Sequence, residues 1–221
     1  MNYENDFLED AQKMWDIKRS GKAYCLPIDF NELRKLNARK FKTKMISKLT
    51  KNEVNYFIKG TELFIQESQT KFDWKLNFMA FTVKIKILDE YIRVHAGFYM
   101  TAMTVFEHLE KTGKTNITKI YGYSHGAGAS PLLALSLRDT GRTLAHITNF
   151  ESPKCIFKPS RHIKLISHRF INYKQGIDAV TTVPWWMTTL GQVRKVKGQK
   201  LPWYKQPLKA LFDHDIYWTK L

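Results

Sequence analysis

The sequence predicts an α/β fold in which a mostly parallel sheet is flanked by helices, with an extra basic helical segment at the N-terminus. From residue 61 onwards, short apolar or alternating runs alternate with amphipathic stretches, as in strands joined by helices. Hydrophobic residues make up 43% of the 221 residues, which excludes a disordered chain of low hydrophobicity. The sequence has no internal repeat and no Pro- or Gly/Ser-rich linker, so residues 1–221 are expected to form a single domain.

Residues 1–58 are expected to be helical and to pack on this domain. Glu9 to Ile17 carries a mixed apolar face. A second helical stretch, rich in Lys and Arg, is expected from Asn31, with Asp29 or Asn31 as its N-cap.

The remaining elements follow from hydrophobic periodicity. Strands are expected at 63–65, 78–88, 91–94, 117–123, 146–150 and 165–172, and helices at 98–109 and 129–138. Asp89-Glu90 is the expected turn between two strands, and Gly113 the end of the first helix. Carboxyl ends of parallel strands meet at one edge, so the loops after Ile65, Tyr123, Phe150 and Tyr173 should lie together there.

The charge is large and uneven. There are 36 Lys and Arg residues against 20 Asp and Glu, a formal net charge of +16. Twelve Lys or Arg residues lie between Lys154 and Lys209, with Asp178 as the only acid. Such a surface attracts polyanions, whether nucleic acid or anionic lipid, although a Lys-rich solvated surface is an equally good interpretation.

Cys25 and Cys155 are too few for a disulfide framework or a four-cysteine zinc site. The first residues lack the basic-then-apolar order of a secretory signal, and no run approaches the roughly 20 apolar residues of a membrane span. The expected location is the cytoplasm, with peripheral membrane binding as an option.

Gly122-Tyr123-Ser124-His125-Gly126 fits the G-x-S-x-G pattern. A predicted strand precedes it and a helix of small residues follows, which is the context of a nucleophile elbow. Ser124 would attack an acyl carbonyl, and the backbone N–H of His125 would face the oxyanion. The alternative is a glycine-rich turn that binds a phosphate or only packs.

A serine nucleophile needs a base and an acid that orients the base, and in this architecture they follow it in the order acid, then histidine. Asp178 follows a predicted strand end and is the leading acid, with Glu151 as a rival. The histidines before Asp178 break the order, which leaves His214 as the base.

Several segments together resemble the class 3 lipases of the α/β-hydrolase fold, over roughly Thr61 to Leu221. They are 63–74, similar to the oxyanion strand and its R-G-T-x-S-x-x-D-W continuation; 94–99, at the start of the helix before the elbow; 149–154, similar to F-G-S-P; 178–184, similar to D-x-V-x-x-L-P; and 214–218, similar to the terminal histidine segment. The resemblance implies an α/β-hydrolase-like sheet, the triad Ser124, Asp178 and His214, and an oxyanion hole formed by Ser68 and His125. Gln66-Glu67 departs from the family's Arg-Gly.

Aromatic residues lie beside cations in the segment between Asp178 and His214. Trp185, Trp186, Trp203 and Tyr204 accompany Lys and Arg, a combination suited to a lipid–water interface and to substrate binding. The alternative is that these rings fill the core. The stretch from Lys75 to Met79 is short, so a large lid there is not expected.

The leading hypothesis is a serine ester hydrolase that acts on a glycerolipid, an acylglycerol or phospholipid, through an acyl-enzyme, with no metal or cofactor. One alternative is a non-catalytic protein that binds nucleic acid or an acidic partner through its basic surface, although nucleic acid is the less favoured partner. Another keeps the triad but uses a thioester or a small soluble ester.

Overall fold

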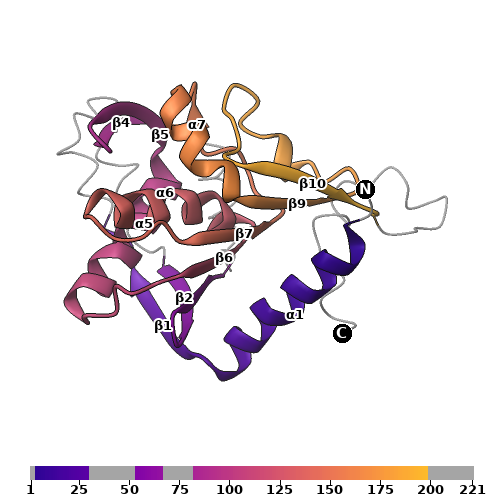
Figure 1. The fold of residues 1–221 in the computed structure, drawn as a ribbon, viewed down its shortest axis with the longest axis horizontal. Coiled ribbons are helices and arrows are strands. Elements are labelled where there is room, and N and C mark those ends of the chain that lie inside the picture. Colours follow the sequence, from indigo (N-terminus) through magenta and orange to yellow (C-terminus); the bar gives the residue numbers. More distant parts are fainter. Residues whose placement is uncertain (1–2, 30–52, 67–81, 199–221) are drawn as a thin grey trace.

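The computed structural model describes residues 3–29, 53–66 and 82–198. Its central element is a seven-stranded sheet in the order β1-β2-β3-β6-β7-β9-β10 (Figure 1). These strands are β1 (Lys22–Pro27), β2 (Glu53–Lys59), β3 (Glu62–Ile65), β6 (Lys119–Tyr123), β7 (His146–Phe150), β9 (Ile171–Gln175) and β10 (Gln192–Val196). The five strands from β3 to β10 are parallel, and β1 and β2 pair antiparallel at one end. The predicted mostly parallel sheet is therefore confirmed, and the carboxyl ends of β3, β6, β7 and β9 share one edge of it as predicted.

Helices cover both faces of this sheet (Figure 1). Helices α5 (Ala96–Lys111) and α6 (His125–Asp139) pack on one face, and α1 (Glu4–Ser20) packs on the other. Strand alternation divides the core, since Leu63 and Ile65 contact the α5–α6 side while Phe64 contacts the α1 side. The sheet is therefore buried on both faces, as parallel sheets usually are.

A second sheet of three strands, β4 (Thr82–Ile87), β5 (Glu90–His95) and β8 (Ile156–Phe157), lies beside the first one. The turn predicted at Asp89-Glu90 lies one residue earlier, since Leu88 and Asp89 form it with φ values of 50° and 60° and Glu90 already begins β5. The remaining elements are α7 (Arg161–Ile166) and the 3₁₀ turns η1 (Ser167–Arg169) and η2 (Val180–Thr182).

The prediction that residues 1–58 are helical is wrong in two places. Helix α1 is confirmed, but β1 and the start of β2 are strands within the main sheet. In β2 the residues alternate between buried and less buried positions, a period of two that belongs to a strand. The predicted helix from Asn31 lies outside the described residues.

The predicted strand at 165–172 is also wrong over most of its length. Residues 161–169 form α7 and η1, and Ser160 caps α7 by accepting a hydrogen bond from the Ile163 amide at 3.1 Å. The strand β9 starts only at Ile171. The helices predicted at 98–109 and 129–138 are confirmed, each with an earlier start. Within the described ranges, no helix is long and apolar enough to cross a bilayer.

Candidate active site

Ser124 lies at the turn between β6 and α6, where the sequence predicts a nucleophile elbow. Its backbone has φ 52° and ψ −116°, a region that L-residues rarely adopt. The turn is held in place because the Ser124 amide donates to the Phe150 carbonyl at 3.0 Å and its own carbonyl accepts from the Ala127 amide at 3.0 Å. Strain at a serine between a strand and a helix is the geometry expected of a nucleophile elbow, and the Ser124 side chain is buried, with 4% exposed.

The elbow needs glycine because two backbones approach closely. A Cβ added to Gly126 would lie 2.2 Å from the carbonyl oxygen of Ile65, the last residue of β3. One added to Gly122 would lie 2.6 Å from the Ala127 Cα atom. The first turn of α6 therefore lies against the end of β3, the strand that leads to the predicted oxyanion residue Ser68.

A buried chain of polar side chains supports the elbow from below. Ser130 on α6 donates to Asn149 on β7 at 2.5 Å, and Asn149 donates to Asn172 on β9 at 3.0 Å. Asn172 donates in turn to the Leu190 carbonyl at 2.7 Å. The chain links the elbow helix to the two neighbouring strands, which fixes their relative positions.

His125, the first residue of α6, is buried beneath the elbow. Its Nε2 atom lies 2.8 Å from the Thr101 hydroxyl on α5, and the Phe98 ring packs edge-on against it. Burial lowers the pKa of His125 to about 4, so the ring is neutral at neutral pH. Its backbone amide is in the first turn of the helix, where N–H groups point toward the N-terminal end, as an oxyanion donor requires.

Asp178 is fully buried in the loop after β9, at the same edge of the sheet as Ser124. Its Oδ1 atom accepts a hydrogen bond from the Val180 amide at 2.9 Å, and its own amide donates to the Gln175 carbonyl at 3.3 Å. The carboxylate is thus fixed in orientation, as the acid of a triad must be.

Glu151, the rival acid, follows β7 and lies beside Asp178. The two carboxyl groups are within hydrogen-bonding reach, and the Glu151 side chain is also fully buried. Burial, and then the hydrogen bond and negative charge of Asp178, raise the pKa of Glu151 well above its usual value. The sequence predicted that the loops carrying both acids lie at one edge of the sheet. Their contact could not be predicted, because it depends on β7 and β9 being neighbours in the sheet.

Glu151 also has a backbone φ of 53°. Left-handed geometry costs an L-residue roughly 1–2 kcal/mol compared with glycine. Burial of the acid and strain of its backbone each reduce the stability of the folded protein. A residue with two such costs is a candidate for a functional role.

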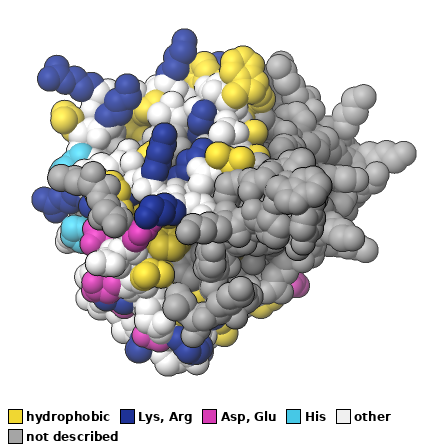
Figure 2. All heavy atoms as spheres, turned by 90° about the vertical axis from the view of Figure 1, so that its right-hand side faces the viewer, with side chains coloured by type: hydrophobic (Ala, Val, Ile, Leu, Met, Phe, Trp, Pro, Cys, Tyr) yellow, Lys and Arg dark blue, Asp and Glu magenta, His cyan; other side chains and the backbone are white. Residues whose placement is uncertain are grey.

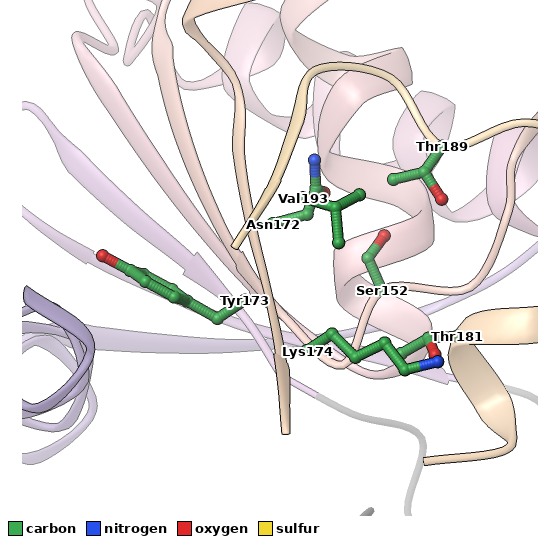
Figure 3. Close-up of a pocket in the computed structure, with 7 residues that line it drawn as sticks. All are labelled: Ser152, Asn172, Tyr173, Lys174, Thr181, Thr189 and Val193. Carbon is green, nitrogen blue, oxygen red and sulfur yellow. The ribbon is translucent and has the colours of Figure 1, made fainter. Parts of the chain in front are cut away.

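A small pocket opens next to these acids, between β9, β10 and the loops after β7 and β9 (Figure 3). Ser152, the neighbour of Glu151, and Thr181, in η2 after Asp178, both line it. The other lining residues are Asn172, Tyr173, Lys174, Thr189 and Val193.

Trp185 and Trp186 lie on the surface and not in the core. Their side chains are 77% and 40% exposed, with the rings edge-on at 5.2 Å. Ile177, the neighbour of Asp178, is 57% exposed. Figure 2 shows Lys and Arg side chains beside hydrophobic ones on the described part of one face.

Other expected site residues, His214, Ser68, Trp203 and Tyr204, lie outside the described residues. In residues 3–29, 53–66 and 82–198, no three His, Cys, Asp or Glu side chains are grouped as metal ligands. Sequence reasoning missed one contact of this region, the Thr101 hydroxyl on His125. Thr101 belongs to an amphipathic helix, and nothing in its spacing marks it.

Comparison with known proteins identifies the fold. No family model and no curated protein matches the sequence. Among solved structures, lipase II from Rhizopus niveus matches with a TM-score of 0.55 at 12% identity, over 96% of this chain and 95% of that one. A propeptide complex of the Rhizomucor miehei lipase matches with 0.51 at 14% identity, over 76% and 63%. The Lip2 lipase from Yarrowia lipolytica matches with 0.50 at 10% identity, over 66% and 61%. This chain has the lipase fold.

The resemblance that the motifs indicated is thus confirmed at the level of the lipase fold, together with the α/β-hydrolase-like sheet. The chain spans less than two thirds of the length of the Rhizomucor and Yarrowia proteins. Identities of 10–14% establish the lipase fold alone, so the roles of Ser124, Asp178 and His214 stay predictions.

Proposed function

We propose that this protein is a serine ester hydrolase that acts on a glycerolipid through an acyl-enzyme. The observation that carries the proposal is the backbone of Ser124, which has a left-handed φ at a glycine-flanked strand-to-helix turn. That geometry projects a hydroxyl above the carboxyl edge of a sheet, the position of the nucleophile in this kind of turn.

The chemistry assigns one role to each residue of the triad. Ser124 attacks the ester carbonyl, His214 takes the hydroxyl proton and returns it to the leaving alcohol, and Asp178 holds the imidazole in the correct tautomer. The amide of His125, with Ser68, stabilises the oxyanion. In the second half of the reaction His214 takes a proton from water, the water oxygen attacks the acyl carbonyl, and His214 returns the proton to the Ser124 oxygen as the carboxylic acid leaves.

The substrate class rests on two supports. The solved structures with this fold are lipases by name. Trp185 and Trp186 are exposed near the Asp178 loop, where indole rings could enter the headgroup layer of a membrane and place the edge of the sheet against lipid. The proposed partner is therefore a lipid surface, contacted peripherally. The cytoplasmic location stays a prediction.

The test is Ser124→Ala, assayed on a short-chain p-nitrophenyl ester and with a fluorophosphonate probe mapped by mass spectrometry. Loss of the nucleophile should reduce kcat by about 10⁵-fold or more and abolish labelling. Ser136→Ala is the matched control, since Ser136 is buried on the same helix and its hydroxyl lies 3.9 Å from the Met103 sulfur. Equal turnover in the two variants would refute the proposal.

The non-catalytic alternative relies on the basic surface, part of which is already paired within the protein. Arg194 and Lys197 lie 3.2 Å and 3.4 Å from Asp6 and Glu4 of α1. Tight nucleic-acid binding with a steep salt dependence, together with no fluorophosphonate labelling, would favour this alternative.

A further inference from the structure

The proposed triad needs one carboxyl group, yet the fold buries two side by side. Glu151 and Asp178 are both fully buried at the edge where the triad is proposed. In the catalytic scheme above, Asp178 has a role and Glu151 has none. The backbone of Glu151 has a φ of 53°, a conformation that glycine would adopt without strain.

The hydrogen bonds of Glu151 leave one oxygen without a donor. Its amide donates to the Tyr173 carbonyl at 3.0 Å, and its Oε1 atom accepts from the Gln175 amide at 2.7 Å. Its Oε2 atom is buried and, counted as a carboxylate oxygen, has no hydrogen-bond partner among the described residues. The Asp178 carboxyl is within reach, but two carboxylates hold no proton between them.

A proton on Glu151 would supply the hydrogen-bond donor that two carboxylates lack. The described charged groups that act on Glu151 are Asp178, from the loop after β9, and Lys174, on β9 itself. Burial and the Asp178 charge favour the neutral acid, whereas Lys174 and the Gln175 amide oppose them more weakly, so the pKa of Glu151 is raised. The Asp178 carboxylate accepts a hydrogen bond from the Val180 amide at 2.9 Å.

We propose that Glu151 is a positioning residue for the triad acid. It keeps its proton in the folded protein and donates it in a hydrogen bond to the Asp178 carboxylate, so that the pair carries a single negative charge. This rests on the proposed function, in which Asp178 orients His214. Loss of the Glu151 proton would remove the donor and put a second buried charge beside the first, so kcat should fall as the pH rises through that ionisation.

The test compares the pH dependence of kcat in the wild type and in Glu151→Gln, on a soluble p-nitrophenyl ester between about pH 6 and pH 10. The glutamine amide keeps a donor toward Asp178 and an acceptor for the Gln175 amide, but it does not ionise. The variant should keep kcat within about threefold of the wild type at neutral pH and lose the decline at high pH. The same decline in both proteins would overturn the proposal.

Glu151→Gly provides a second variant whose backbone suits the left-handed position. It removes the donor, so kcat should fall about tenfold or more at every pH while the protein stays folded. A residue that only filled space would also tolerate Glu151→Gln at neutral pH, but the decline of kcat at high pH would then be the same in that variant as in the wild type. Full activity in Glu151→Gly would overturn the proposal.

An infrared measurement separates this proposal from the proposed function. At neutral pH the wild type should show the carbonyl stretch of a protonated carboxylic acid, and Glu151→Gln should lack it. Absence of the band in the wild type would overturn the shared proton, whatever the activity. A band that depends on Glu151 in a protein with no hydrolysis dependent on Ser124 would support the proton pair and refute the hydrolase.

Discussion

The Thr101 hydroxyl and the Nε2 atom of His125 lie 2.8 Å apart in a buried hydrogen bond that joins α5 to the first residue of the elbow helix. The bond fixes the ring next to Ser124, and burial lowers the pKa of that ring to about 4. His125 therefore couples the stability of the elbow to acidity.

Stability should decline on acidification because of His125. Between about pH 6.5 and pH 4 the unfolded chain binds a proton at this position that the folded protein excludes, so the free energy of unfolding falls as the pH falls. The loss should be on the order of 3 kcal/mol across that window. Urea unfolding over this pH range should show a shallower dependence in His125→Gln, with the exposed His146→Gln as control. A slope that His125→Gln leaves unchanged would contradict the assignment.

Glu151 should act in the opposite direction. Its pKa is raised in the folded protein, so above about pH 4.5 the unfolded chain loses a proton that the folded protein keeps. The free energy of unfolding should then fall by about 1.4 kcal/mol per pH unit more steeply in the wild type than in Glu151→Gln, up to the pH at which folded Glu151 ionises. Denaturant titrations at several pH values measure the difference. Glu107→Gln, on the exposed side of α5, should follow the wild type.

Gly126→Ala should disable the elbow. The added Cβ would lie 2.2 Å from the Ile65 carbonyl oxygen, so the backbone of α6 or β3 has to shift. We expect a destabilisation of about 1–3 kcal/mol and loss of fluorophosphonate labelling at Ser124. Gly60→Ala is the control, because its φ is also positive but its surroundings are open. It should cost about 1 kcal/mol with labelling intact. Labelling at the wild-type rate in Gly126→Ala would show that the close approach is dispensable.

Asp10 should hold α1 on the sheet. Its Oδ1 atom pairs with Lys119 on β6 and its Oδ2 atom accepts from the Tyr173 hydroxyl on β9, each at 3.1 Å. Asp10→Ala should reduce the free energy of unfolding by about 1–3 kcal/mol, since both partners lose their acceptor. Glu9→Ala removes the neighbouring acid, which forms an exposed ion pair with Lys13 along the surface of the helix, and should have little effect. Similar losses in the two variants, measured by urea unfolding, would contradict this role.

Trp185 and Trp186 should contribute to binding of lipid vesicles but not to hydrolysis of a soluble ester. The double variant Trp185→Ala and Trp186→Ala should bind anionic vesicles about tenfold or more weakly, because a buried aromatic side chain contributes about 1.5–3 kcal/mol. Turnover of a p-nitrophenyl ester should stay unchanged. Tyr91→Ala is the control, as this ring is 69% exposed on β5. Equal vesicle binding by both variants in a sedimentation assay would show that the two indole rings do not contact the lipid.

Much of the fold could be predicted because the signals were local. The apolar run around Leu63, the alternation around Ile85 and the small residues after Ser124 each specify an element through a period of two or 3.6 residues. Residues 22–27 were not predictable in this way. That strand is at the end of the sheet and mostly exposed, so its composition lacks a clear buried face. The strand predicted at 165–172 was wrong for another reason, because the first apolar residues of that segment belong to a short helix that precedes the strand.

Local sequence patterns were enough to predict most strands and helices of the lipase fold from β3 onwards, and the order of the candidate residues Ser124, Asp178 and His214 along the chain. Glycines, strand periods and motif spacing are properties of neighbouring residues, and these can be read without coordinates. The contacts of Glu151 with Asp178 and of Thr101 with His125 became visible only in the folded structure. The same is true of the exposure of Trp185 and Trp186. Such contacts depend on which strands become neighbours and how closely their ends approach, and this is set by the packing of the whole chain.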